Sequence, residues 1–169
     1  MKSSKGKEAN PDRVSVPFDL EDFLPYRLSV TSNRVSRLFG AQYSTQFGLT
    51  IPEWRVLAAV GRLGTCSPTA VGAFSAMDKV KVSRAAASLV VKGMLRQGRD
   101  PSDGRGRLLR MTRKGVAVHG EVVLLARGLE ATLAEGLTKA EWAALNKALV
   151  KLSAHVGDIV GPDVGDAPD

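Results

Sequence analysis

The stretch DPSDGRGRLLRMTRKG, Asp100 to Gly115, crowds arginines around two glycines and ends in a Thr-X-X-Gly sequence. Three interpretations are open: a disordered basic loop, a glycine loop that cradles phosphate, and the tip of a β-hairpin. The runs MLRQGRD and RLLRMT lie on either side of PSDGRG, which is rich in turn-forming residues. GRGR lacks the Gly-Lys-Ser/Thr ending that a phosphate loop needs. The pattern therefore predicts a β-hairpin.

Two short helices are predicted before the hairpin. In SPTAVGAFSAM, Ser67 is a good N-cap and Pro68 suits the first helical position. In DKVKVSRAAASLVVKGML, Asp78 is the expected N-cap and Gly93 the expected end. Its predicted inner face consists of Val82, Ala85, Ala86, Leu89 and Val90. Two helices joined by a tight connection form a helix-turn-helix, whose second helix enters the major groove by its N-terminal turns.

The positive charge is concentrated in this same part of the chain. Between Lys79 and Lys114 there are eleven Lys and Arg and two Asp, a net charge of +9, whereas the rest of the chain carries −2. Clustered cations release counterions from nucleic acid, so the clustering indicates a polyanionic partner rather than an ordinary solvated face. No aromatic residue is interleaved with these cations, which favours duplex DNA over RNA or single strands.

Longer amphipathic helices are predicted on both sides of this reader. Thr50 with Glu53, and Thr138 with Glu141, each form a capping box at a helix start, and Thr112 is the expected cap of a helix after the hairpin. The first helix carries a helical stripe from Leu24 to Gln42, in which Thr31 and Gln42 are polar members, and it is expected to stop at Gly48. The last helix carries a coiled-coil-like seam formed by Trp142, Leu145, Leu149, Leu152, Val156 and Ile159.

These stripes offer more apolar surface than one small domain covers, which favours an intertwined homodimer over packing within a single subunit. The predicted fold is mostly α with a small β-hairpin wing: a winged helix-turn-helix DNA-binding domain over 49–112. An N-terminal dimerisation helix over 18–48 and C-terminal dimerisation helices over 113–160 flank it. Residues 1–17 are expected to form a flexible basic tail and residues 161–169 an acidic flexible tail.

The sequence argues against several other classes of protein. His119 and His155 each stand alone, and no catalytic, metal-binding or cofactor-binding motif is visible, so we expect no enzyme, metal or cofactor. The single cysteine, Cys66, allows no internal disulfide, fits a reducing cytoplasm, and is interpreted as an inert thiol. No apolar run approaches the roughly 18 residues that cross a bilayer, and no secretory signal is present. We therefore expect a cytoplasmic protein that does not bind membranes.

From Leu20 to Ile159 the order of these elements resembles the MarR/SlyA family of transcriptional regulators. The most specific part is Asp-Pro-X-Asp-X-Arg, then an apolar residue and Leu/Met-Thr-X-X-Gly. This sequence supplies it as Asp100, Pro101, Asp103, Arg105, Leu109, Met111, Thr112 and Gly115. The resemblance implies a winged-helix homodimer that binds pseudo-palindromic operators, often released by small anionic or phenolic ligands.

The resemblance also implies roles for individual residues. Arg105 would enter the minor groove from the wing tip, and Asp103 would hold an arginine and the hairpin turn in place. The recognition helix and the helix before it would supply the contacts to bases and phosphates. The predicted DNA-binding residues are Ser67, Thr69, Lys79, Lys81, Ser83, Arg84, Arg105 and Arg107. Unlike the common wing, this one has Gly104 and Gly106 on either side of Arg105.

An effector pocket is expected between the dimerisation helices and the reader. Its predicted wall residues are Arg27, Trp54 and His119, although an interhelix salt bridge is an equally good role for Arg27. The function expected from the sequence is a dimeric, sequence-specific DNA-binding regulator, acting as a repressor that a small aromatic or anionic ligand releases. The alternative is a non-specific basic nucleic-acid-binding or architectural protein without effector control.

Overall fold

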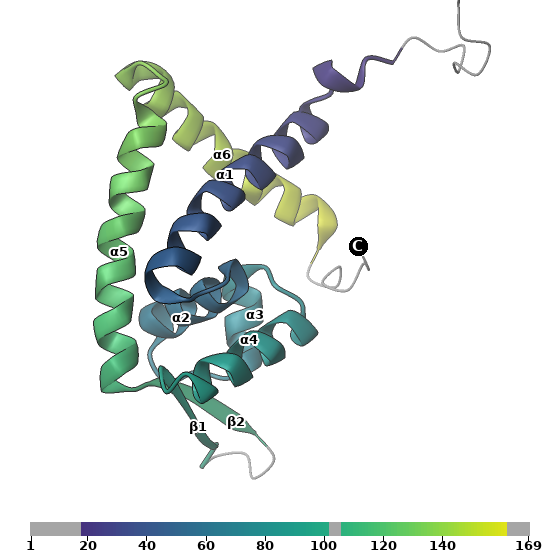
Figure 1. Ribbon diagram of the computed structural model, residues 1–169. Coiled ribbons are helices and arrows are strands. Elements are labelled where there is room, and N and C mark those ends of the chain that lie inside the picture. Colours follow the sequence, from purple (N-terminus) through teal and green to yellow (C-terminus); the bar gives the residue numbers. More distant parts are fainter. Residues whose placement is uncertain (1–17, 102–105, 162–169) are drawn as a thin grey trace, which may run out of the picture. The chain divides into compact units, whose positions relative to one another are not determined.

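The computed structural model describes residues 18–101 and 106–161. They form a 3-10 helix and six α-helices with one antiparallel hairpin, so the predicted mostly helical fold with a β-hairpin is confirmed (Figure 1). In chain order the elements are η1 (Leu20–Asp22), α1 (Leu24–Phe47), α2 (Ile51–Leu63), α3 (Pro68–Ser75), α4 (Lys79–Val91), β1 (Leu95–Arg99), β2 (Arg107–Met111), α5 (Arg113–Ala134) and α6 (Lys139–Val160).

The predicted caps lie where the helices begin. Ser67 caps α3, where its Oγ accepts a hydrogen bond from the backbone N–H of Ala70. Asp78 caps α4 in the same way, through the N–H of Lys81. Each cap satisfies a backbone donor that the helix itself leaves without a partner. The start of each helix is thus fixed by local sequence, as the spacing predicts.

The chain divides into two compact units, and the first ends at Ser36. In its described part, Asp19 caps η1, and the rings of Phe18 and Phe23 meet edge to face at 5.2 Å. Arg27 pairs with Asp22 at 3.7 Å, and both side chains are exposed. Arg27 therefore makes a local ion pair between two neighbouring elements of this unit.

The second unit, from Arg37 onward, holds the hydrophobic core. Helices α2, α3 and α4 pack on one another and on the hairpin, and α5 packs on α2. The largest fully buried aliphatic side chains are Leu49, Val56, Leu57, Val60, Val71, Val82, Leu89, Leu95, Leu109 and Val122. The inner face of α4 is buried as predicted except at Val90, which is 37% exposed, so that prediction was wrong. Val90 lies at the edge of the buried stripe rather than within it.

Both strands of the hairpin contribute a buried leucine to the core. β1 and β2 pair antiparallel, with Leu95 opposite Met111 and Arg99 opposite Arg107. Leu109 is fully buried and exchanges two backbone hydrogen bonds with Cys66, at 3.1 and 2.8 Å. Burial raises the pKa of the Cys66 thiol, which favours its protonated form.

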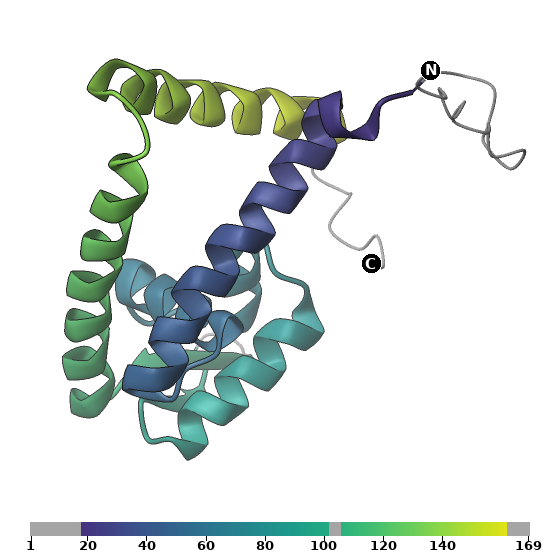
Figure 2. The same ribbon diagram turned by 45° about the horizontal axis from the view of Figure 1, so that its top comes forward.

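Helix α6 differs from all the other α-helices in its packing. It follows from the end of α5 that lies far from the hairpin (Figure 2). The predicted capping box of Thr138 and Glu141 is present, yet none of the side chains described in α6 is buried. Its apolar seam is exposed from Leu145 to Ile159, which is 70% exposed, whereas Trp142 is half-buried. Within the described ranges, no helix is both long and apolar enough to cross a bilayer.

Candidate nucleic-acid interface

The turn between α3 and α4 is tight and has specific backbone requirements. Ala76 ends α3 in the left-handed conformation, with φ of 50°, and the N–H of Met77 donates to the carbonyl of Gly72 at 3.1 Å. A Cβ added to Gly72 would lie 3.0 Å from the Met77 carbonyl oxygen. Asp78 then starts α4 at once, which sets the two helices in a helix-turn-helix arrangement.

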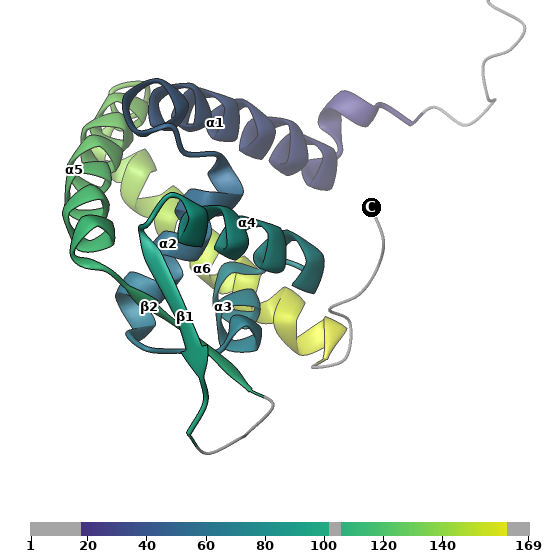
Figure 3. The same cartoon turned by 60° about the horizontal axis from the view of Figure 1, so that its bottom comes forward.

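Helix α4 presents a charged and polar surface away from the core. Val82, Ala85, Ala86 and Leu89 are buried, whereas Lys79, Lys81, Ser83 and Arg84 are exposed. Lys81 also pairs with its own N-cap, Asp78, at 3.3 Å. The four residues predicted on this helix are thus together and accessible. Figure 3 shows α3 and α4 beside the hairpin in one view.

The remaining predicted DNA-binding residues differ in their surroundings. Thr69 is exposed in the first turn of α3, while half-buried Ser67 already accepts a hydrogen bond as the N-cap. Arg107 is exposed on β2 and donates to the side chain of Gln97 at 3.3 Å. Asp103 and Arg105 lie outside the described residues, so their roles stay predictions.

The Thr-X-X-Gly sequence holds the start of α5 against the short segment between α4 and β1. The Thr112 hydroxyl donates to the Gly93 carbonyl at 2.7 Å and accepts from the N–H of Gly115 at 3.0 Å. The Thr112 N–H donates to the Met94 carbonyl at 3.0 Å. A Cβ at Gly115 would lie 2.0 Å from that same carbonyl oxygen, so only glycine fits there. The structure thus explains why threonine stands at 112 and glycine at 115.

A buried ion pair joins α2 to the far end of α4. Glu53 is 4% exposed and accepts hydrogen bonds from Ser88 at 2.5 Å and from the Lys92 ammonium group at 2.6 Å. Its other oxygen accepts from the Thr50 backbone at 2.7 Å, and Lys92 also donates to the Gly48 carbonyl. Burial would raise the pKa of Glu53, but the hydrogen bonds from Lys92, Ser88 and Thr50 outweigh it and lower the pKa.

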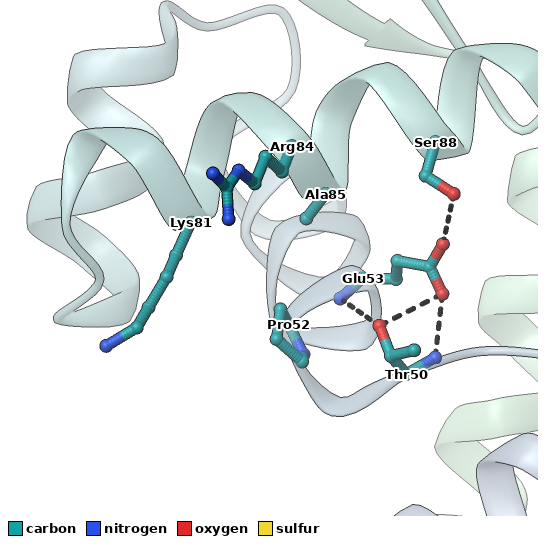
Figure 4. A pocket seen from close by; sticks show the side chains of 7 residues that line it. All are labelled: Thr50, Pro52, Glu53, Lys81, Arg84, Ala85 and Ser88. Carbon is teal, nitrogen blue, oxygen red and sulfur yellow. Dashed lines mark hydrogen bonds between the residues drawn. The ribbon is translucent and has the colours of Figure 1, made fainter.

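These contacts hold one end of a small pocket between the two helices. The pocket has a volume of about 230 Å³, with Glu53 and Ser88 at one end and Lys81 and Arg84 at the other (Figure 4). Sequence reasoning identified Glu53 only as a capping residue and counted Lys92 among the basic cluster. No local signal links these residues, because 39 positions separate Glu53 from Lys92.

Two of the three predicted effector residues meet at the junction of α2 and α5. The rings of Trp54 and His119 are 5.6 Å apart, and the ring of Tyr43 lies 5.5 Å from that of Trp54. A Cβ at Gly61 would lie 2.7 Å from Nε2 of His119, so the imidazole fits closely over this glycine. Burial lowers the pKa of His119 and favours the neutral ring. Arg27 belongs to the first unit and has Asp22 as its partner.

The arrangement of α3, α4 and the hairpin defines the class of domain. A helix-turn-helix followed directly by an antiparallel hairpin is a winged helix-turn-helix, a DNA-binding domain. Within the ranges the structure describes, no group of three or more His, Cys, Asp or Glu side chains is placed to hold a metal ion.

Residues 47–106 match the model of the MarR family. The solved structure of *Bordetella bronchiseptica* BpsR, described as regulated in its DNA binding by 6-hydroxynicotinic acid, is 27% identical. The match covers 75% of this chain and 98% of that one, with a TM-score of 0.65. The predicted resemblance to MarR-family transcriptional regulators is confirmed by this family-model match and by the similar solved structures.

Further solved structures have the same fold. A mutant MarR from *E. coli*, complexed with operator DNA, is 25% identical over 76% of this chain and 92% of that chain, with a TM-score of 0.70. A MarR/EmrR family regulator from *Acinetobacter* sp. ADP1 is 22% identical over 83% of this chain and 99% of that chain, with a TM-score of 0.75. Among curated protein sequences, none matches this chain significantly.

Proposed function

We propose that the protein is a homodimeric repressor that binds a pseudo-palindromic operator in duplex DNA. A small aromatic or anionic ligand releases the repressor from this operator. The observation that carries the proposal is the exposed face of α4, where Lys79, Lys81, Ser83 and Arg84 project beside a basic hairpin. The N-terminal turns of α4 enter the major groove and contact base edges. Thr69 and Arg107 contact the phosphates on either side.

The uncovered surface of α6 supports the dimer. Its seam of Leu145, Leu149, Leu152, Val156 and Ile159 is exposed in the single chain. Soluble proteins rarely leave contiguous apolar patches of this kind uncovered, and burying them against a second copy contributes about 25 cal/mol per Å². Sedimentation at micromolar concentration is expected to give a dimer. A monomer at that concentration would contradict the proposal.

The ring pair of Trp54 and His119 supports a role for this junction in effector binding. BpsR from Bordetella bronchiseptica is one precedent among the similar structures, because 6-hydroxynicotinic acid regulates its DNA binding. We propose that a small aromatic acid binds beside these two rings. In a Trp142→Phe variant, Trp54 is the only tryptophan, so its fluorescence should change on titration with 6-hydroxynicotinic acid or related acids. An unchanged signal with every acid would count against this site.

Selection of bound duplexes from random DNA tests the proposed function as a whole. We expect a pseudo-palindromic consensus whose half-sites lie about 34–36 Å apart, one turn of the double helix. Affinity should fall with salt, with a log–log slope of about −0.9 per phosphate neutralised. Selection without any consensus, together with equal binding of duplex and single strands, would favour the non-specific alternative. A gel shift with the selected duplex, repeated in the presence of small aromatic acids, tests whether these acids release the protein from DNA.

A further inference from the structure

The outermost ridge of α4 is apolar rather than charged. Val80, Ala87 and Val91 recur at spacings of seven and four, which keeps them on one side of a helix with 3.6 residues per turn. Val80 is 57% exposed and Val91 88% exposed, and Ala87 is exposed between them. The buried stripe of α4 lies on the opposite side of the helix. This exposed ridge is therefore the part of α4 that projects farthest from the core.

The charges of the first turn lie on either side of this ridge. Successive residues of an α-helix are about 100° apart, so Lys79 and Lys81 point to the two flanks of Val80. In a helix lying in the major groove, the flanks face the two phosphate backbones and the ridge faces the base edges. The lysines are thus placed for phosphates, and the valine is placed for the floor of the groove.

An apolar side chain at the floor of the major groove has a specific partner. The C5-methyl group of thymine is the apolar feature that a base pair presents there, and it distinguishes A·T from T·A and from both G·C orientations. Val80 carries two methyl groups at the reading end of α4. Exposed apolar residues are common on surfaces, but this one lies at the centre of the face that enters the groove.

We propose that Val80 is a specificity-determining residue that recognises thymine through contact with its 5-methyl group. The inference rests on the proposed DNA-binding function of α4. It adds a preference for thymine at one position of each half-site, which the charged residues of the same turn do not supply. Deoxyuridine, which lacks only this methyl group, is the matching probe.

Val91 is the matched control on the same ridge. It is the same residue type and is more exposed than Val80, and it lies eleven residues farther along α4. At 1.5 Å per residue this places it about 16 Å toward the C-terminal end of the helix, away from the turns that contact bases. Valine to alanine raises helix propensity at either position, so both variants should fold. Circular dichroism melting of both variants checks this.

The experiment uses the duplex selected from random DNA, remade with deoxyuridine in place of thymine one position at a time. With the wild-type protein, one position in each half-site should weaken binding about fourfold, the effect of withdrawing one buried methyl group. The Val80→Ala variant should bind the thymine and deoxyuridine duplexes equally at that position. The Val91→Ala variant should keep the wild-type difference.

The outcomes separate this inference from the proposed function. If wild-type protein selects a consensus but tolerates deoxyuridine everywhere, the inference is overturned and the regulator remains. The same holds if Val80→Ala keeps the full sensitivity to deoxyuridine, or if Val91→Ala loses it equally. If no consensus is selected at all, the proposed sequence-specific function itself fails.

Discussion

Helices α2 and α6 both begin with a capping box, but the two boxes differ in burial and in their further contacts. Both have a threonine N-cap and a glutamate three residues later, and in both the glutamate bonds back to the threonine. Glu141 is exposed, and its carboxylate accepts hydrogen bonds from the backbone and the hydroxyl of Thr138. Glu53 is buried and also binds Ser88 of α4 and Lys92, the C-cap of α4. One capping box therefore only begins a helix in solvent, while the other also joins two helices.

The largest expected effect comes from removing the buried glutamate. Glu53→Ala leaves Lys92 without its carboxylate partner, and breaking a buried ion pair in this way costs about 3 kcal/mol. Chemical denaturation at one fixed protein concentration measures the free energy of unfolding, since a dimer's stability depends on concentration. Glu141→Ala is the matched control. Equal losses in the two variants would contradict the difference drawn between the two capping boxes.

Helix α5 is the third helix with a threonine N-cap, and its first turn packs closely against the backbone of Met94. Gly115→Ala places a Cβ against the Met94 carbonyl, and overpacking of this kind costs about 2 kcal/mol. Gly120→Ala is the control within α5, because nothing lies within 4 Å of a Cβ there. It should stabilise the helix by up to about 1 kcal/mol. Thermal melts of both variants should move in opposite directions.

Lowering the pH should remove the stabilising contribution of the Glu53 charge, with a smaller effect than the substitution to alanine. The pKa of Glu53 is lower in the folded protein than its ordinary value of 4.5, so its stabilising contribution is present above pH 4.5. That contribution is lost as the pH falls through the folded-state pKa. The difference in unfolding free energy between wild type and Glu53→Gln should therefore shrink with acidification below pH 4.5. A constant difference across that range would show that the charge of Glu53 does not stabilise the fold.

The smallest effect is expected at the exposed capping box. Hydrogen bonds from Thr138 lower the pKa of Glu141, but the carboxylate stays in solvent and has water as an alternative partner. Glu141→Gln should shift the melting temperature only slightly and leave operator affinity unchanged in a gel shift. A change in affinity would mean that the start of α6 influences the reader.

Local sequence was enough to predict the elements because their signals are local. Thr50, Ser67, Asp78, Thr112 and Thr138 each cap a helix through a residue no more than three positions away. The wing was predicted for the same reason, since turn formers between two short runs specify a hairpin. The positions of Lys79, Lys81, Ser83 and Arg84 followed from the helical period of their buried neighbours.

Contacts between distant segments were not predictable in the same way. Lys92 reads as one more cation of a basic cluster, and only the packing of α4 on α2 makes it the partner of Glu53. The Gly61 backbone likewise gives no sign that His119 lies over it. Trp54 and His119 were suggested as pocket-wall residues by the family resemblance rather than by spacing, and their close ring contact at 5.6 Å was not predicted.

The hydrogen bonds around Thr112 have a mechanical consequence. They join the first turn of α5 to Gly93 and Met94, which lie between the end of α4 and the first strand of the hairpin. Lys114 adds a bond to the Lys92 carbonyl at 2.8 Å. The start of α5 is thus fixed to the segment that joins α4 to the hairpin. We therefore expect a tilt of α5 to displace α4 and the hairpin together with it.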